Sequence, residues 1–134
     1  MDEQKRQKAL QILSQIYADA RPALHYNTAY ELLVAVILSA QCTDERVNKV
    51  TAELFKEHNT PQTMLQLTQE ELEKYIFSCG LYKSKAAHIL SASRDIVDKF
   101  SGQVPSGFSD LKSLAGVGQK TANVVSSVWF EKDA

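Results

Sequence analysis

A hairpin between two helices is predicted by the stretch Leu111-Lys112-Ser113-Leu114-Ala115-Gly116-Val117-Gly118-Gln119-Lys120-Thr121-Ala122. Leu111, Leu114 and Val117 are spaced to anchor it in a core. Gly116 and Gly118 allow positive φ and leave the backbone amides uncovered. Amides at a helix start bind anions such as a DNA phosphate, and such a contact fixes position without reading sequence. A phosphate-binding hairpin is therefore predicted, although a glycine pair alone also fits an ordinary tight turn between helices.

The lysine that follows this hairpin is a candidate nucleophile. Lys120 falls in the first turn of the predicted helix. There the positive end of the helix dipole and partial burial would both disfavour the charged ammonium form. Because a neutral amine is nucleophilic, we predict a catalytic role for Lys120. The alternative is a solvated surface lysine with no role.

Outward from the hairpin, the chain has helical periodicity throughout. An amphipathic stripe runs along residues 3–18, and an apolar run at 31–39 follows a capping box predicted for Thr28 and Glu31. No strand-like alternation occurs at a useful length. We therefore predict an all-α fold, a compact multi-helix domain with a helix-hairpin-helix motif. The other helices are expected to begin near Thr43, at Thr60-Pro61 and at Thr68, and to cover 84–100, 109–114 and 119–130.

Composition excludes several classes of protein. The 134 residues include only 5 Gly and 3 Pro, and 44% are hydrophobic, which argues against an all-β fold and against disorder. Two cysteines and three histidines lie far apart, so we predict no metal site and no cofactor held by this chain alone. The longest apolar run, 32–38, is too short to span a bilayer, and no signal peptide is evident. A cytoplasmic protein is expected.

Charge is distributed unevenly along the chain. Residues 79–122, which contain both glycine loops, carry six basic and three acidic side chains, whereas the whole chain has a formal net charge of −1. This local excess fits nucleic-acid binding, but a solvated helix face gives the same pattern.

Two further motifs complete a family pattern. They are Ser39-Ala40-Gln41-Cys42-Thr43-Asp44 and Gly80-Leu81-Tyr82-Lys83-Ser84-Lys85-Ala86. With the hairpin stretch, in this order and spacing, the chain closely resembles the endonuclease III family of DNA glycosylases and abasic-site lyases over essentially its whole length. The resemblance implies base-excision repair of oxidised pyrimidines in bacterial, nucleoid-associated DNA.

The resemblance also implies roles for individual residues. Lys120 matches the lysine that attacks C1′ of the damaged nucleotide and forms a Schiff base, after which β-elimination breaks the strand. Gln41 matches the residue that fills the gap left by the extruded nucleotide, and Leu81 matches the wedge in the base stack. Such enzymes must extrude the nucleotide because its target atom is out of reach in a stacked duplex. The predicted DNA-binding residues are Gln41, Leu81, Lys83, Lys85, Gly116, Val117, Gly118 and Thr121.

The sequence departs from the family pattern after the hairpin. Family members carry a catalytic aspartate in a Val-Asp-Thr-His type segment and four cysteines that hold a 4Fe-4S cluster. Neither is present before Ala134, and Asp133 lacks the flanking residues, so we expect weakened base excision. Residues 1–20 would form an N-terminal helix that packs on such a missing segment, and 21–134 a helical DNA-binding and glycosylase domain with its hairpin at 111–125. Leu10 and Leu13 would then be left uncovered or paired with a second copy.

Two further interpretations stay open at this stage. A non-catalytic helix-hairpin-helix module would bind double-stranded DNA, including damaged or abasic sites, without reacting. An inert fragment would fold and bind little DNA. No membrane partner is expected under any of the three.

Overall fold

The computed structural model describes residues 24–130, and the predicted helix at 3–18 and the unit 1–20, with Leu10 and Leu13, lie outside the described residues. Residues 24–130 form helices, turns and loops without a strand, which confirms the predicted all-α class. The helices are α2 (Ala29–Ser39), α3 (Asp44–Leu54), α4 (Pro61–Met64), α5 (Gln69–Ile76), α6 (Tyr82–Lys99), α7 (Phe108–Lys112), α8 (Gln119–Val125) and the π-helical turn η1 (Ser126–Phe130).

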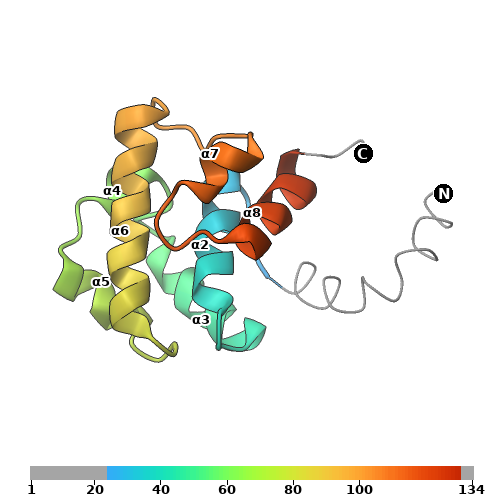
Figure 1. Cartoon of the computed structure of the whole chain (residues 1–134). Helices are drawn as coiled ribbons and strands as arrows, with labels where there is room; N and C mark the ends of the chain where they lie inside the picture. The colour runs from blue at the N-terminus through green and yellow to red at the C-terminus, as the bar shows by residue number, and fades with distance from the viewer. Residues whose placement is uncertain (1–23, 131–134) are drawn as a thin grey trace, which may run out of the picture.

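The core is centred on α2, the most apolar helix. Leu32, Ala35 and Leu38 are fully buried, and α3, α6 and α8 all pack against this helix. Figure 1 shows α2 between α6 and α8. A helix that is apolar on nearly all sides is stable only when it is surrounded, so the sequence of 31–39 dictates this central place.

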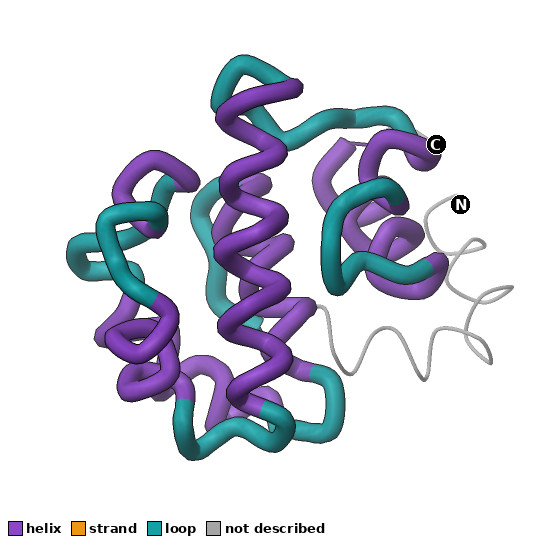
Figure 2. The backbone as a smooth tube through the Cα atoms, turned by 60° about the vertical axis from the view of Figure 1, so that its left-hand side comes forward, coloured by secondary structure: helices purple, strands orange, loops and turns teal. Residues whose placement is uncertain are grey.

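The long helix α6 divides the other elements into two groups. α4 and α5 pack on one side of it, and Figure 2 shows the hairpin of α7 and α8 on the other side. The three buried positions Ile89, Ala92 and Ile96 follow helical spacing along α6. This arrangement places the α7–α8 loop beside α6, where the candidate site is built.

Two predicted helix starts have the expected caps, and one differs. Thr68 and Glu71 form the predicted capping box, and Thr60 caps α4 with Pro61 in the first position. At α2, Thr28 accepts a hydrogen bond from the amide of Glu31, but the Glu31 carboxylate turns elsewhere. It accepts from the Asn27 amide at 2.8 Å and from the side-chain amide of Asn59 at 3.2 Å. The box predicted at α2 is therefore wrong in its second half, because buried Glu31 links α2 to the α3–α4 connection.

A buried hydrogen bond joins α2 to α6. Tyr30 Oη lies 2.6 Å from Ser93 Oγ, and Ser93 Oγ donates to the Ile89 carbonyl at 2.7 Å. The serine proton is thus engaged, so Tyr30 is the donor to Ser93. Burial raises the pKa of Tyr30 above its ordinary value of 10.0, and the hydrogen bond with Ser93 opposes this only in part.

Tyr30→Phe is expected to lower the free energy of unfolding by about 1 kcal/mol near pH 7. Because folding raises the pKa of this phenol, its protonated form stabilises the fold fully below pH 10, and that contribution falls as the pH rises further. Urea unfolding of wild type and variant at about pH 7 and about pH 10.5 measures the loss of stability and its dependence on pH. The gap between wild type and variant should shrink at the higher pH, and a constant gap would contradict this account.

Candidate nucleic-acid interface

The predicted hairpin lies between α7 and α8, and its three apolar anchors face the core. Leu111, Leu114 and Val117 are all buried, as expected. The amide of Val117 donates to the Leu114 carbonyl at 3.1 Å and closes the turn. Gly116 has φ +78°, whereas Gly118 has φ −93° and ψ −171°, an extended conformation open to any residue. The prediction that both glycines serve a positive φ is therefore right for Gly116 only.

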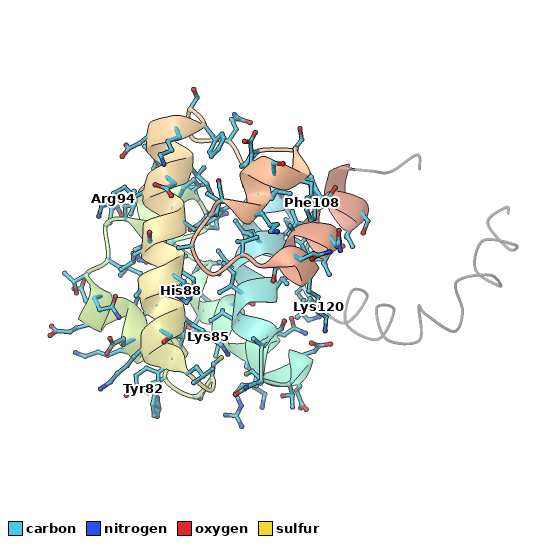
Figure 3. All side chains as sticks on the ribbon, in the orientation of Figure 1. Tyr82, Lys85, His88, Arg94, Phe108 and Lys120 are labelled. Carbon is cyan, nitrogen blue, oxygen red and sulfur yellow. The ribbon has the colours of Figure 1, made fainter. Side chains whose placement is uncertain are left out.

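Gly116 is also required because α6 approaches it closely. A Cβ atom at this position would lie 2.7 Å from the Cβ atom of His88 and 3.1 Å from its Nδ1. Figure 3 shows His88 on α6, beside the hairpin. Nothing in the sequence indicates that His88 lies here, because only tertiary packing brings it to this loop.

Gly118 begins α8 and leaves its first amides accessible. As N-cap it has no side chain to accept their hydrogen bonds, and a Cβ atom here would meet nothing within 4 Å. Gly118 and Gln119 are both exposed. Uncapped amides at the positive end of a helix can bind an anion, so the geometry suits the predicted phosphate contact. That contact itself stays a prediction.

Lys120 is exposed, so its predicted partial burial is wrong. α2 and α7 cover the side of α8 that carries Ala122 and Val125, and Lys120 projects roughly half a turn away from Ala122. Figure 3 shows Lys120 at the beginning of α8, clear of α6. Its place directly after the hairpin is as expected, and its role as nucleophile stays a prediction.

The remaining hairpin residues contribute unequally. Val117 is buried, and its amide donates to the Leu114 carbonyl. Neither its side chain nor its amide is therefore free to make the predicted contact with DNA. Its part is to shape the loop. Thr121 is half-buried in the first turn of α8, and Lys83 is exposed in the first turn of α6. Both of these positions are compatible with a DNA contact, which stays a prediction.

Gln41 and Leu81 lie on two turns that touch. Both have φ +58°, a left-handed conformation that non-glycine residues adopt rarely, and both are exposed. Leu81 keeps 58% of its surface exposed, although it is apolar. A Cβ atom on Gly80 would lie 3.1 Å from the Gln41 carbonyl oxygen, so only glycine fits there easily. The structure thus brings together the two residues predicted to enter the duplex, and Figure 1 shows both turns at the same end of the molecule.

Lys85 is buried, so its predicted contact with DNA is wrong. Its Nζ donates to the Leu38 carbonyl at 2.8 Å and to the Ala40 carbonyl, both at the C-terminal end of α2. A cation suits this end of a helix, where carbonyls lack partners and the dipole is negative. The spacing of positions 85, 89, 92 and 96 already placed this lysine on the buried side of α6, but its residue type suggested solvent.

The thiols of Cys42 and Cys79 interact electrostatically with the Lys85 ammonium and with each other. Burial raises the pKa of Cys79 to about 12, and a hydrogen bond with Cys42 acts in the same direction. Burial likewise lowers the pKa of Lys85, and the thiolate forms of Cys79 and Cys42 would oppose this shift. This cluster could not be predicted from the sequence, because the two cysteines are 37 positions apart and meet only through the packing of α2 on α6.

The two cysteines should therefore differ in reactivity. Cys42 is half-buried, whereas Cys79 is 1% exposed and stays protonated near pH 8, so its alkylation by iodoacetamide should be at least about 100-fold slower. Peptide mass spectrometry after timed labelling measures both rates. Cys42→Ser serves as the control that isolates Cys79. Equal rates in the native chain would contradict the structure.

The described part of the chain also has a cleft of about 780 Å³ along α2 and α3. Leu24, Tyr26, Glu31 and Phe55 are among the residues that line it. None of the residues predicted to bind DNA or to react lines this cleft. The candidate interface is thus a surface of loops and helix ends.

Between residues 24 and 130, no cluster of three or more His, Cys, Asp or Glu side chains could hold a metal ion. The two cysteines of the chain cannot supply the four thiolates that hold a 4Fe-4S cluster, so its residues do not fit that group. None of the helices in this described range is long and apolar enough to cross a bilayer.

The geometry defines a class of protein: a helical domain that presents a glycine hairpin, a neighbouring lysine and two protruding turns. The chain belongs to the HhH-GPD superfamily of base excision DNA repair proteins, whose pattern matches residues 34–132. It is similar to Endonuclease III of Haemophilus influenzae, with 46% identity over 130 residues that cover 97% of this chain and 62% of that protein. It is also similar to Endonuclease III of Escherichia coli K12, with 42% identity over 97% of this chain and 62% of that protein.

Two solved structures are also similar to this chain. A trapped covalent intermediate of Endonuclease III with DNA, an estranged-adenine complex, matches with a TM-score of 0.82 and 44% identity over 96% of this chain and 60% of that chain. A thermostable thymine-DNA glycosylase shares the fold, with a TM-score of 0.79 and 24% identity over 99% of this chain and 63% of that one. The chain therefore spans about 60% of the length of the relatives that it matches.

Proposed function

We propose that this chain is the hairpin-bearing part of a DNA glycosylase and abasic-site lyase that acts on oxidised pyrimidines. The observation that supports this proposal most is the position of Lys120. It is exposed in the first turn of α8, directly after the hairpin, where the helix N-terminus has no side-chain cap. Support comes from the similarity to an Endonuclease III that was trapped covalently on DNA. The bacterial relatives support a location at chromosomal DNA in the cytoplasm.

In this proposal the hairpin positions the strand and Lys120 reacts. The amides that follow Gly118 hold a phosphate, which sets the sugar in reach of the Lys120 amine. The neutral amine adds to C1′ of the open abasic sugar, and loss of water gives the Schiff base. Removal of a proton from C2′ then breaks the C3′–O bond of the strand. Gln41 fills the gap left by the extruded nucleotide, and Leu81 is the wedge in the base stack.

Of the two reactions, abasic-site cleavage needs less from the protein than base excision. No carboxylate among residues 24–130 forms an ion pair with Lys120, and the lysine is exposed. Base excision needs a group that takes the lysine proton and stabilises charge on the sugar. A preformed abasic site already presents an electrophilic carbon. We therefore assign the lyase step to residues 24–130, whereas base excision requires a carboxylate from outside these residues.

A non-catalytic DNA-binding module is the second candidate, and the exposure of Lys120 without a described base favours it. Borohydride reduction in the presence of an abasic-site duplex separates the two. A covalent adduct supports the enzyme, and salt-sensitive binding without an adduct supports the module. Absence of binding at low salt would overturn both. A duplex with an oxidised pyrimidine in place of the abasic site should give far less adduct.

A further inference from the structure

The helix α2 ends in carbonyl groups that a distant side chain satisfies. The Ser39 carbonyl accepts from the Cys42 amide, while those of Leu38 and Ala40 accept from Lys85 Nζ, 47 and 45 positions away in sequence. The Ala40 carbonyl belongs to the peptide that joins Ala40 to Gln41. The lysine thus holds the residue that directly precedes the left-handed Gln41.

The backbone of the same lysine holds the second turn. The Lys85 amide donates to the Leu81 carbonyl at 2.9 Å, and this closes the first turn of α6 behind the left-handed Leu81. One residue therefore contacts both turns, with its side chain on the Gln41 side and its main chain on the Leu81 side. The close approach of Gly80 to the Gln41 carbonyl leaves little space for either turn to shift alone.

We propose that Lys85 is a positioning residue that holds the Gln41 turn against the Leu81 turn, so that both side chains enter a damaged duplex as one unit. This inference rests on the proposed function. Lys85 takes no part in the chemistry, because its ammonium is buried and donates to two backbone carbonyls. Its substitution should therefore reduce the filling of the gap more than it reduces overall binding, because binding depends mainly on phosphate contacts.

The test uses a duplex with a tetrahydrofuran abasic-site analogue opposite 2-aminopurine, whose fluorescence rises when the base is unstacked. The whole chain should raise this fluorescence. Lys85→Met should reduce the rise by about fivefold or more, with less than a threefold change in affinity measured by anisotropy. Lys99→Met is the matched control, because Lys99 lies at the other end of α6 with 68% of its side chain exposed. It should match wild type.

Double variants show whether Lys85→Met acts through the Gln41 and Leu81 turns. If Lys85 acts through the Gln41 turn, Lys85→Met should add less than about twofold in a Gln41→Ala background. Because the two side chains act as one unit, it should also add less than about twofold in a Leu81→Ala background. A merely structural role would keep its full effect in both backgrounds and would lower affinity in parallel with fluorescence. That outcome would overturn the inference.

Circular dichroism establishes whether Lys85→Met folds. If it does not, Gly80→Ala decides, since its Cβ atom would press on the Gln41 carbonyl while Lys85 stays in place. It should lower the fluorescence rise with near-normal affinity, and an unchanged rise would overturn the inference. Failure of the wild-type chain to raise fluorescence or bind the duplex would instead overturn the proposed function, and the inference with it.

Discussion

Lys120→Ala is expected to reduce the borohydride-trapped adduct with an abasic-site duplex by at least about 1000-fold. The reason is that the Schiff base requires a primary amine at this point beside the hairpin, and alanine supplies none. Affinity for the duplex should fall by no more than about tenfold, because only one cation near the backbone is lost. Adduct is measured by denaturing gel electrophoresis and affinity by fluorescence anisotropy.

Lys112→Ala is the matched control for this experiment. Lys112 lies on α7 of the same hairpin and is exposed, with its Nζ 5.9 Å from the centre of the Phe108 ring. This variant loses the same charge in the same region but keeps Lys120, the proposed nucleophile. Its adduct yield should therefore stay within about twofold of wild type. Equal loss in both variants would mean that charge near the hairpin, and not the Lys120 amine, limits trapping.

The two hairpin glycines are expected to fail in different ways when each is replaced by alanine. Gly116→Ala combines a positive φ with a 2.7 Å approach to the His88 Cβ atom, so the free energy of unfolding should fall by about 2–4 kcal/mol. Gly118→Ala meets nothing within 4 Å and keeps an ordinary φ, so stability should change by less than about 0.5 kcal/mol.

Among folded variants, Gly118→Ala should lose more affinity for DNA than Gly116→Ala, which is the opposite of their order in stability loss. A methyl group at Gly118 stands beside the uncapped amides of α8, so affinity for the abasic-site duplex should fall about tenfold. Urea unfolding and anisotropy give the two quantities for each variant. Unchanged affinity in Gly118→Ala would contradict the phosphate contact assigned to this loop, and a loss of stability would contradict the open space around Gly118.

Much of the fold follows from the sequence because it depends on local spacing. The apolar run at 31–39 required a surrounded helix, and α2 is the centre of the core. Thr60 and Thr68 marked helix starts through their hydroxyl groups. The spacing of Leu111, Leu114 and Val117 predicted three buried anchors, and all three are buried.

The parts that the sequence did not predict depend on contacts between distant segments. The exposure of Lys120 follows from which side of α8 is covered, and helix spacing alone does not show that side. The left-handed turns at Gln41 and Leu81 occur at residues that ordinarily avoid positive φ, and their neighbours across the turn hold them there. The burial of Lys85 depends on carbonyl acceptors some 45 positions away.

Site mapping of the trapped adduct by tandem mass spectrometry tests the central claim most directly. The whole chain is reduced with borohydride on an abasic-site duplex and digested, and the sugar-modified residue is identified. We predict that the modification lies on Lys120. A modification on Lys83, on Lys112 or on the N-terminal amine, with Lys120 unmodified, would contradict the proposed function.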